Sequence, residues 1–297
     1  MKIVITGSSG LIGSALTAAF IANGDEVGRL FRVRSQDRNP YWNLESRIID
    51  LYDFKEPDVV IHLAGDNISE GRWTKAKKSR MVDSRIKSTQ LLADYLAQLS
   101  CKPKVFISGS AIGFYGHRKE MLLDEAAPQG SGFLADLCSQ WEDATSSAVK
   151  AGIKVVNIRT GIVLSPSGGA LKKMRFPFML GLGGIVGDGN QYMSWISIQD
   201  VVGAIQHLMS NDAIQGPVNL VSPTPVTNRI FTKTLGSVLH RPTVLPLPAF
   251  AARIVFGEMA NELLLSSIRV IPKKLTDSGY RFRHSDLKDA LQHSYPL

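Results

Sequence analysis

Short apolar runs rich in β-branched residues alternate with helix-length segments through the first two thirds of the chain. The strand candidates are residues 2–5, 26–31, 47–49, 59–63, 105–108 and 154–158. The helix candidates are residues 11–23, 79–99, 133–151 and 197–210. Because each strand candidate is followed by a connection long enough to hold a helix, this alternation predicts an α/β fold: a doubly wound parallel sheet with helices on both faces.

Glycine and proline become more frequent after residue 164. The run from Gly181 to Gly189 contains five glycines, which favours a flap whose backbone adopts special conformations. The proline-rich stretch from Ser222 onward predicts a smaller C-terminal lobe. We therefore assign residues 1–164 and 193–221 to the main domain, and residues 165–192 and 222–297 to the flap and a small substrate lobe. A length of 297 residues suits this division.

The basic residues are too dispersed to form a nucleic-acid site. Thirty-four Lys and Arg against 26 Asp and Glu give a net charge of +8, which favours anionic partners in general. The densest groups lie at residues 29–38 and 75–78, and no zinc-finger or aromatic RNA-reading motif accompanies them. We expect no nucleic-acid partner.

The chain carries no recognisable targeting or membrane-spanning segment. The first strand candidate begins at Lys2, which leaves no room for a signal peptide, and the longest apolar runs are shorter than the ~18 residues that cross a bilayer. Only Cys101 and Cys138 are available as thiols. We expect a cytoplasmic protein with no membrane partner and no metal site, and the oligomeric state stays open.

A glycine-rich turn joins the first strand candidate to the first helix. Its sequence is Gly7-x-x-Gly10-x-x-Gly13, followed by apolar helix residues. Such a turn brings backbone N–H groups and the positive end of a helix against a pyrophosphate, as in Rossmann dinucleotide-binding folds. The nucleotide is therefore expected on Gly7, Gly10, Leu11, Ile12 and Gly13. A structural turn without a ligand is the alternative.

The end of the second strand candidate indicates which dinucleotide is bound. An NAD-selective protein places Asp or Glu there to accept from the ribose 2′-hydroxyl, whereas this chain reads Leu30-Phe31-Arg32. A guanidinium can pair with a 2′-phosphate, and Arg29 or Arg34 could assist Arg32. These residues favour NADP(H) as the cofactor, unless the arginines are only solvated surface charges.

The glycine turn and several further motifs link the chain to a known family. The glycine turn, His62-Leu63-Ala64-Gly65 and the segment from Ser108 to Gly116 resemble extended short-chain dehydrogenases, the group that contains nucleotide-sugar epimerases and dehydratases. The pairs Arg72-Trp73, Ser84-Arg85 and Trp141-Glu142, together with residues 133–138, 159–164 and 181–184, are similar to its atypical "epimerase family" subgroup. Residues 247–248, 272–274 and 279–282 resemble that subgroup's C-terminal domain of unknown function.

The resemblance implies cofactor contacts and a catalytic set. The implied contacts are Phe31, Arg32, Leu63, Ala64, Arg80, Arg85 and Val163. Members of the superfamily use a Tyr, a Lys four residues later and a Ser or Thr for proton transfer. Ser110 supplies the hydroxyl position, but Phe133 and Leu137 stand where the Tyr and Lys are expected.

Other polar residues could take the place of the missing pair. Tyr115 is close in sequence to Ser110 and is either catalytic or a structural end to its strand. Asp136 and Glu142 are six residues apart and so face different sides of one helix. We interpret both as surface charges. Trp195 and Asp200 could line the substrate cleft, and core packing is an equal alternative for Trp195.

Two functions remain after these motifs. The first is an NADP(H)-dependent oxidoreductase or epimerase that acts on a small polar or sugar-like substrate without the usual Tyr-Lys dyad. The second is a non-catalytic, NADPH-sensing regulatory protein, which the loss of the dyad favours.

Overall fold

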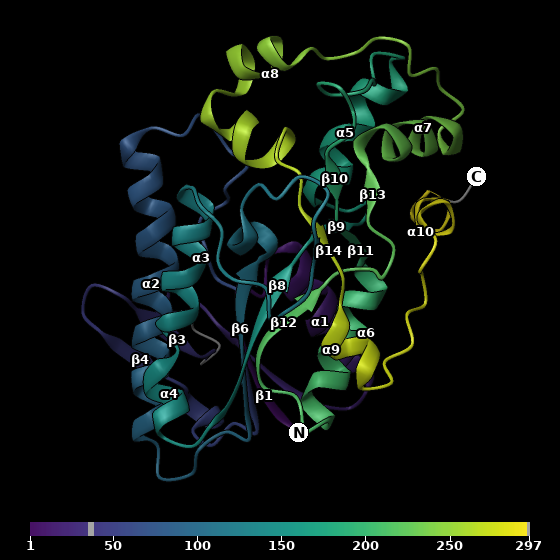
Figure 1. The fold of residues 1–297 in the computed structure, drawn as a ribbon. Helices are drawn as coiled ribbons and strands as arrows, with labels where there is room; N and C mark the ends of the chain where they lie inside the picture. The colour runs from purple at the N-terminus through teal and green to yellow at the C-terminus, as the bar shows by residue number, and fades with distance from the viewer. Residues whose placement is uncertain (35–38, 296–297) are drawn as a thin grey trace.

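A six-stranded parallel sheet forms the centre of the protein. The computed structural model describes residues 1–34 and 39–295. The strand order is β2-β1-β5-β6-β8-β12, and every pairing in the sheet is parallel. The strands are β1 (Lys2–Thr6), β2 (Glu26–Leu30), β5 (Val59–His62), β6 (Val105–Ala111), β8 (Lys154–Thr160) and β12 (Gly216–Leu220). Helices cover both faces of this sheet (Figure 1), which confirms the doubly wound α/β prediction.

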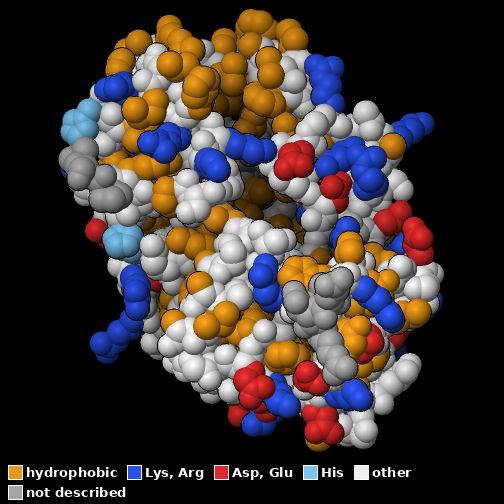
Figure 2. Space-filling model, turned by 180° about the vertical axis from the view of Figure 1, so that it is seen from behind, with side chains coloured by type: hydrophobic (Ala, Val, Ile, Leu, Met, Phe, Trp, Pro, Cys, Tyr) orange, Lys and Arg blue, Asp and Glu red, His pale blue; other side chains and the backbone are white. Residues whose placement is uncertain are grey.

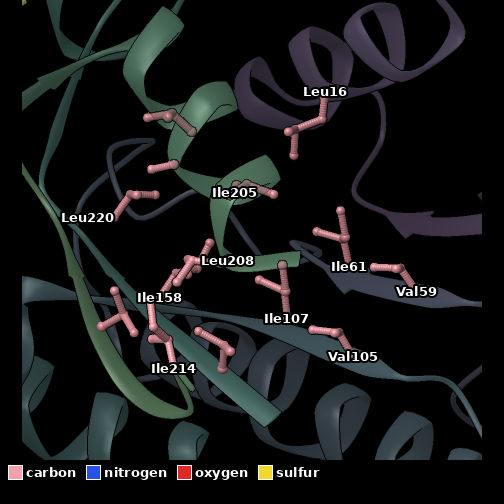
Figure 3. Close-up of a cluster of buried hydrophobic side chains, with 14 of the residues drawn as sticks. Leu16, Val59, Ile61, Val105, Ile107, Ile158, Ile205, Leu208, Ile214 and Leu220 are labelled. Carbon is pink, nitrogen blue, oxygen red and sulfur yellow. The ribbon is translucent and has the colours of Figure 1, made fainter. Parts of the chain in front are cut away.

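Alternating side chains of the strands build a separate core on each face. On one face Ile61 and Ile107 pack against Leu16 of α1 (Leu11–Ala22) and Leu208 of α6 (Ile198–Ser210), as Figure 3 shows. The other face is covered by α2 (Lys75–Gln98), α3 (Phe133–Asp143) and α4 (Ser146–Lys150). Because neighbouring residues of a strand point to opposite faces, strands buried on both sides are apolar almost throughout.

The predicted strand at residues 47–49 does not join the main sheet. Its residues enter β4 (Ile48–Asp50), which pairs antiparallel with β3 (Tyr41–Asn43). The Asn43 carboxamide oxygen accepts from the backbone N–H groups of Glu45 and Ser46, both at 2.9 Å, and so stabilises a tight turn. A single bridge between Phe31 and Tyr41 links this hairpin to the end of β2.

Two other elements differ from the expectation. The sixth strand is β12, which we did not predict from the sequence because its first residues, Gly216 and Pro217, are poor strand formers. Pro217 is tolerated there because β12 is an edge strand with one paired side. The helix predicted for residues 133–151 is broken at Thr145, whose hydroxyl donates to the Glu142 carbonyl at 2.7 Å.

An upper lobe lies above the carboxyl ends of the sheet strands (Figure 1). It contains α5 (Gly169–Met179), α7 (Asn228–Val238), α8 (Ala249–Phe256) and the π-helix η3 (Ala260–Leu264). Besides the β3-β4 hairpin, three pairs of short strands form. They are β9 (Ile162–Leu164) with β11 (Trp195–Ser197), β10 (Tyr192–Met193) with β13 (Val226–Thr227), and β7 (Leu122–Leu123) with β14 (Arg269–Val270).

The remaining short elements are the 3-10 helices η1 (Tyr52–Phe54) and η2 (Ile112–Tyr115), and the helices α9 (Lys273–Asp277) and α10 (Leu287–Ser294).

In the part of the chain that the structure describes, no helix is both long and apolar enough to cross a membrane. Figure 2 shows the molecule from behind, with a hollow between its upper and lower parts.

Candidate cofactor and active site

The glycine turn between β1 and α1 is packed too closely for other residues. Gly7 has φ +66°, and a Cβ there would lie 2.7 Å from the carbonyl carbon of Leu63. A Cβ on Gly13 would lie 2.2 Å from the Gly7 oxygen. The first glycine therefore lets the turn approach the end of β5, and the third lets α1 begin directly against the turn.

Gly10 is less closely packed than Gly7 and Gly13. Its φ is −75°, and the nearest atom to a Cβ at this position would be the Gly7 oxygen at 3.3 Å, a tight contact that a small shift of the turn would relieve. Gly10 is the N-cap of α1, which has no side-chain cap and no acidic residue in its first turn. The first N–H groups of α1 are thus open to an anion, and a bare Gly10 keeps the approach clear.

Three arginines lie near the end of β2, and two of them are engaged. Arg29 donates from Nε to the Ser8 hydroxyl at 3.2 Å and lies 5.0 Å from the Phe31 ring. Arg34 lies 5.0 Å from the Tyr41 ring. Arg32 is exposed and makes no hydrogen bond or ion pair within residues 1–34 and 39–295. Its guanidinium is therefore available to an anionic ligand.

The other predicted cofactor contacts, except Arg80, lie around the same edge of the sheet. Leu11 and Ile12 begin α1, Leu63 follows β5 and Val163 lies within β9. These four side chains are half-buried, and Ala64 is buried beside them. The backbone N–H groups of Leu63 and Ala64 donate to the Thr6 hydroxyl oxygen at 3.1 and 3.2 Å, which fixes β5 against β1. The cofactor roles of these residues stay predictions.

The two arginines of α2 have different surroundings. Arg85 is half-buried, with its guanidinium 5.0 Å from the Trp141 ring and close to Gly65. Burial lowers the pKa of Arg85, so an anion that approached it would stabilise its charge. Arg80 lies on an exposed part of α2.

His62 is a buried structural residue with a defined tautomer. The Ser88 hydroxyl donates to the Ser84 carbonyl at 2.7 Å, so its oxygen accepts from His62 Nε2 at 3.1 Å. Nδ1 is left to accept from the Thr6 hydroxyl at 2.7 Å. Burial, together with the charges of Arg32 and Arg85, lowers the pKa of His62 to about 3.

The positions expected for the Tyr-Lys dyad contain only apolar side chains. Phe133 packs edge-on against Trp73 with ring centroids 5.6 Å apart, and Leu137 is buried in the same cluster. The next residue, Cys138, is also buried, and burial raises the pKa of its thiol to about 12. None of these three side chains can exchange a proton readily at neutral pH.

A buried polar network takes up the space between β6, β8 and α3. The Ser110 hydroxyl donates to Glu142 Oε1 at 2.6 Å, and Arg159 donates to both Glu142 carboxylate oxygens, at 2.8 and 2.9 Å. The Glu142 side chain is only 11% exposed. The interpretation of Glu142 as a surface charge is therefore wrong, because β8 places a guanidinium opposite it. Asp136 is exposed, as expected.

Tyr115 belongs to the same network and is fully buried. Its hydroxyl donates to the Asn219 side-chain oxygen at 2.7 Å and accepts from Arg159 at 3.0 Å. Burial raises the pKa of Tyr115 above its usual value, so the phenol stays protonated. The structure thus brings the two catalytic candidates, Ser110 and Tyr115, into one network through Arg159, which we did not single out from the sequence.

Trp195 and Asp200 both lie in the core. Trp195 packs in the cluster that includes Leu164 and Phe231, and its indole N–H donates to the Thr224 carbonyl at 3.0 Å. Asp200 is fully buried, and its carboxylate accepts hydrogen bonds from the Ser197 hydroxyl and from the backbone N–H group of Arg283 in the C-terminal segment. Burial supports the core packing considered for Trp195, and the buried Asp200 does not line a cleft either.

Comparison with known proteins gives a consistent relationship over the whole chain. Epimerase family protein Mb2239 of Mycobacterium bovis is 44% identical over 293 residues, which cover 98% of this chain and 97% of that protein. The crystal structure of human epimerase family protein SDR39U1 with NADPH matches with a TM-score of 0.89 at 30% identity, covering 100% of both chains. UDP-glucose 4-epimerase from Thermus thermophilus shares the fold, with a TM-score of 0.72 at 17% identity over 100% of this chain and 99% of that one.

Two family descriptions divide the sequence between them. Residues 247–294 match a domain of unknown function, DUF1731. Residues 3–220, which include the glycine turn and the polar network around Ser110, match the NAD-dependent epimerase/dehydratase family. These matches confirm the resemblance inferred from the motifs. The chain belongs to the NAD-dependent epimerase/dehydratase family.

Proposed function

We propose that this protein binds NADP(H) and uses it as an oxidoreductase or epimerase on a small polar or sugar-like substrate, without a Tyr-Lys dyad. The observation that carries the proposal is the open start of α1, which has Gly10 as its N-cap, no side-chain cap and no acidic residue in its first turn. A pyrophosphate fits this site because the helix N-terminus presents N–H donors and a positive dipole. The NADPH-bound human relative supports the same cofactor.

Arg32 selects NADP(H) over NAD(H) in this proposal. It follows β2, is exposed, and has no carboxylate partner among the described residues. A guanidinium there pairs with a 2′-phosphate, whereas an acid would repel it. Arg32→Ala should lower the affinity for NADPH at least tenfold and leave the affinity for NADH nearly unchanged. Lys102→Ala, a change of another exposed cation, is the matched control in the same calorimetric titration.

Nicotinamide, when bound, supplies a hydride donor or acceptor, and the chain must bind and orient the substrate. Ser110 is suited to orientation, because its proton is donated to Glu142 and its oxygen lone pairs remain as acceptors. Arg159 holds Glu142 by two charge-assisted hydrogen bonds, and this fixes the direction of the Ser110 hydroxyl. We therefore expect a substrate hydroxyl to donate a hydrogen bond to the Ser110 oxygen.

A non-catalytic NADPH sensor is the second candidate function. It is favoured by Phe133 and Leu137, which cannot transfer a proton, and by the complete burial of Tyr115. A sensor needs the cofactor site but no group beside the nicotinamide that exchanges protons. The two functions make the same prediction for cofactor binding and opposite predictions for turnover.

Turnover measurements separate the two candidates. The purified protein is incubated with NADPH and a panel of carbonyl compounds, and NADPH consumption is recorded. It is also incubated with NADP+ and a panel of sugars, and the configuration of the sugars is followed by NMR, because an epimerase returns its cofactor unchanged. The enzyme proposal predicts reduction or epimerisation of at least one compound and a rate at least tenfold lower in Ser110→Ala. Ser210→Ala, at the exposed end of α6, is the control and should match the wild type. Tight NADPH binding with neither reaction across the panels would instead support the sensor.

A further inference from the structure

The top of the upper lobe exposes a group of large apolar side chains, which we call the apolar cap. Val244, Phe250 and Ile254 are 75%, 66% and 67% exposed. The cap consists of Phe176, Met179, Leu180, Leu182, Val244, Leu245, Phe250, Ile254 and Val255. In Figure 2 apolar side chains gather over the top of the molecule. Contiguous apolar surface of this kind marks an interaction site, since isolated exposed apolar residues are otherwise scattered.

Three segments of the chain build the cap and are bonded to one another. Arg241 donates from Nε to the Met179 carbonyl at 3.1 Å, which joins the loop before α8 to the end of α5. The Leu247 N–H donates to the Ile185 carbonyl at 2.8 Å. In α8 Ala252 is buried, so the helix packs by that side and leaves Phe250 and Ile254 outside. The exposed residues are therefore held in place by the fold.

Positive charge predominates around the apolar cap. Residues 165–187 and 229–257, which supply the cap, contain no Asp or Glu, and the exposed acids that follow these ranges are Asp188 and Glu258. Glu258 is already paired with Lys78 at 2.9 Å. The two ranges contain seven exposed cations: Lys172, Lys173, Arg175, Arg229, Lys233, Arg241 and Arg253. In Figure 2 acidic side chains lie beside basic ones below the apolar top, and none lies on the top itself. The excess of cations favours a partner that is apolar and anionic at once.

A second copy of the chain does not fit this requirement. A two-fold contact places the same patch of both subunits face to face, which would bring the seven cations of each copy together with only Asp188 and Glu258 beside them to compensate the charge. The surface of an anionic bilayer offers both phosphate charges and an apolar interior at a depth that exposed Phe, Ile and Val side chains can reach.

We propose that the apolar cap binds the surface of an anionic lipid bilayer, with Phe250 and Ile254 inserted and the surrounding cations on the lipid headgroups. Surface attachment needs no spanning helix, so it is compatible with the absence of one from the described residues. The proposal departs from the expectation, drawn from the sequence, that the protein has no membrane partner. It also does not depend on the cofactor site.

Tryptophan fluorescence gives a direct test on the full chain. The four tryptophans, Trp42, Trp73, Trp141 and Trp195, are all buried, so Phe250→Trp would introduce an exposed indole. Vesicles of phosphatidylcholine with phosphatidylglycerol should shift its emission to shorter wavelength, and brominated lipid should quench it. Val149→Trp, at an exposed site on α4, is the matched control and should show neither effect.

Sedimentation with the same vesicles tests the apolar and the basic side chains of this surface separately. Phe250→Ser with Ile254→Ser should lower the bound fraction at least tenfold, and so should Lys172→Gln with Lys233→Gln. Ile21→Ser with Val149→Ser, and Lys55→Gln with Lys102→Gln, change exposed residues outside the cap and should bind as the wild type does. Failure of the wild type to bind anionic vesicles would overturn the proposal and leave an acidic protein as the partner. Equal binding of the cap variants would overturn it too.

Discussion

The ion pair between Arg159 and Glu142 withdraws two charges from water. Arg159 is 4% exposed and Glu142 is 11% exposed, and two hydrogen bonds join them. Removing one member of such a pair leaves the other charge buried without compensation, which costs about 3–5 kcal/mol. Replacing both members together avoids that penalty.

Glu142→Ala should therefore lower the free energy of unfolding by about 3–5 kcal/mol, measured by urea denaturation. Asp136→Ala changes an exposed acid on the same helix and should have little effect. The double variant Glu142→Gln with Arg159→Met should lose less than the sum of its single changes. A loss below about 1 kcal/mol for Glu142→Ala would show that the pair is not a structural unit.

His62 makes the stability depend on pH in a definite direction. Its pKa is about 3 in the folded protein and about 6.5 in an unfolded chain. Between these values the unfolded state binds more protons, so the free energy of unfolding rises with pH by up to about 1.4 kcal/mol per pH unit. This contribution is complete above about pH 6.5 and is lost as the pH falls.

The unfolding free energy of the wild type should thus fall more steeply between pH 6.5 and pH 4 than that of His62→Gln, in parallel denaturation series. Nitrogen chemical shifts of the imidazole should report a neutral ring protonated at Nε2 throughout this range. Parallel slopes for the two proteins, or a ring that titrates near pH 6, would contradict the assigned tautomer and burial.

The residues of the site differ in how far sequence alone could identify them. Gly7, Gly13 and Arg32 lie within short local patterns whose spacing already indicates a phosphate turn and the end of a strand. Glu142 and Arg159 are 17 residues apart on a helix and a strand. Their pairing depends on the register between α3 and β8, which no local pattern contains.

At the scale of elements, the apolar strands β1, β5, β6 and β8 could be predicted because burial on both faces makes them continuously apolar. β12 could not, since Gly216 and Pro217 are typical of turns. The strand expected at residues 47–49 forms as β4, but its expected place in the parallel sheet was wrong because the Asn43 turn folds that segment back on β3. Local turn chemistry decided the pairing there.

The start of α1 allows the requirements of the fold to be separated from those of the ligand. A methyl group at Gly10 would lie 3.3 Å from the Gly7 oxygen, which a small shift of the turn can accommodate, whereas one at Gly13 would lie only 2.2 Å from the same atom. The free energy of unfolding of Gly10→Ala should therefore lie within about 1 kcal/mol of the wild-type value. The same variant should bind NADPH at least tenfold more weakly. Gly13→Ala should lose both stability and binding. Undiminished NADPH binding by Gly10→Ala would show that this helix start does not hold the pyrophosphate.

At the scale of the whole molecule, Asp200 in α6 bonds the C-terminal segment to the helices that pack on the main sheet. Its carboxylate accepts from the Ser197 and Tyr280 hydroxyls and from the backbone N–H groups of Arg283 and His284. Since Asp200 is fully buried, loss of its carboxylate would leave three donors without that acceptor, while the Tyr280 hydroxyl could still donate to the Asp200 carbonyl at 3.2 Å.

Asp200→Ala should lower the free energy of unfolding by about 3 kcal/mol or more. It should also speed amide hydrogen exchange at residues 280–285, which precede α10, more than in β5 and β6, because the segment would open locally before the sheet does. Asp286→Ala, which removes the N-cap of α10, is a control that should speed exchange within α10 and not at residues 280–285. Uniform exchange changes across the chain would contradict a local anchor.

An NADP(H) site formed by the turn at the start of α1 together with Arg32 underlies the proposed function. Calorimetric titration of the wild-type protein with NADPH and with NADH is the decisive experiment for it. We expect both dinucleotides to bind through the pyrophosphate, with NADPH at least tenfold tighter. NADH binding as tight as NADPH would contradict the role of Arg32, and binding of neither would contradict the site itself.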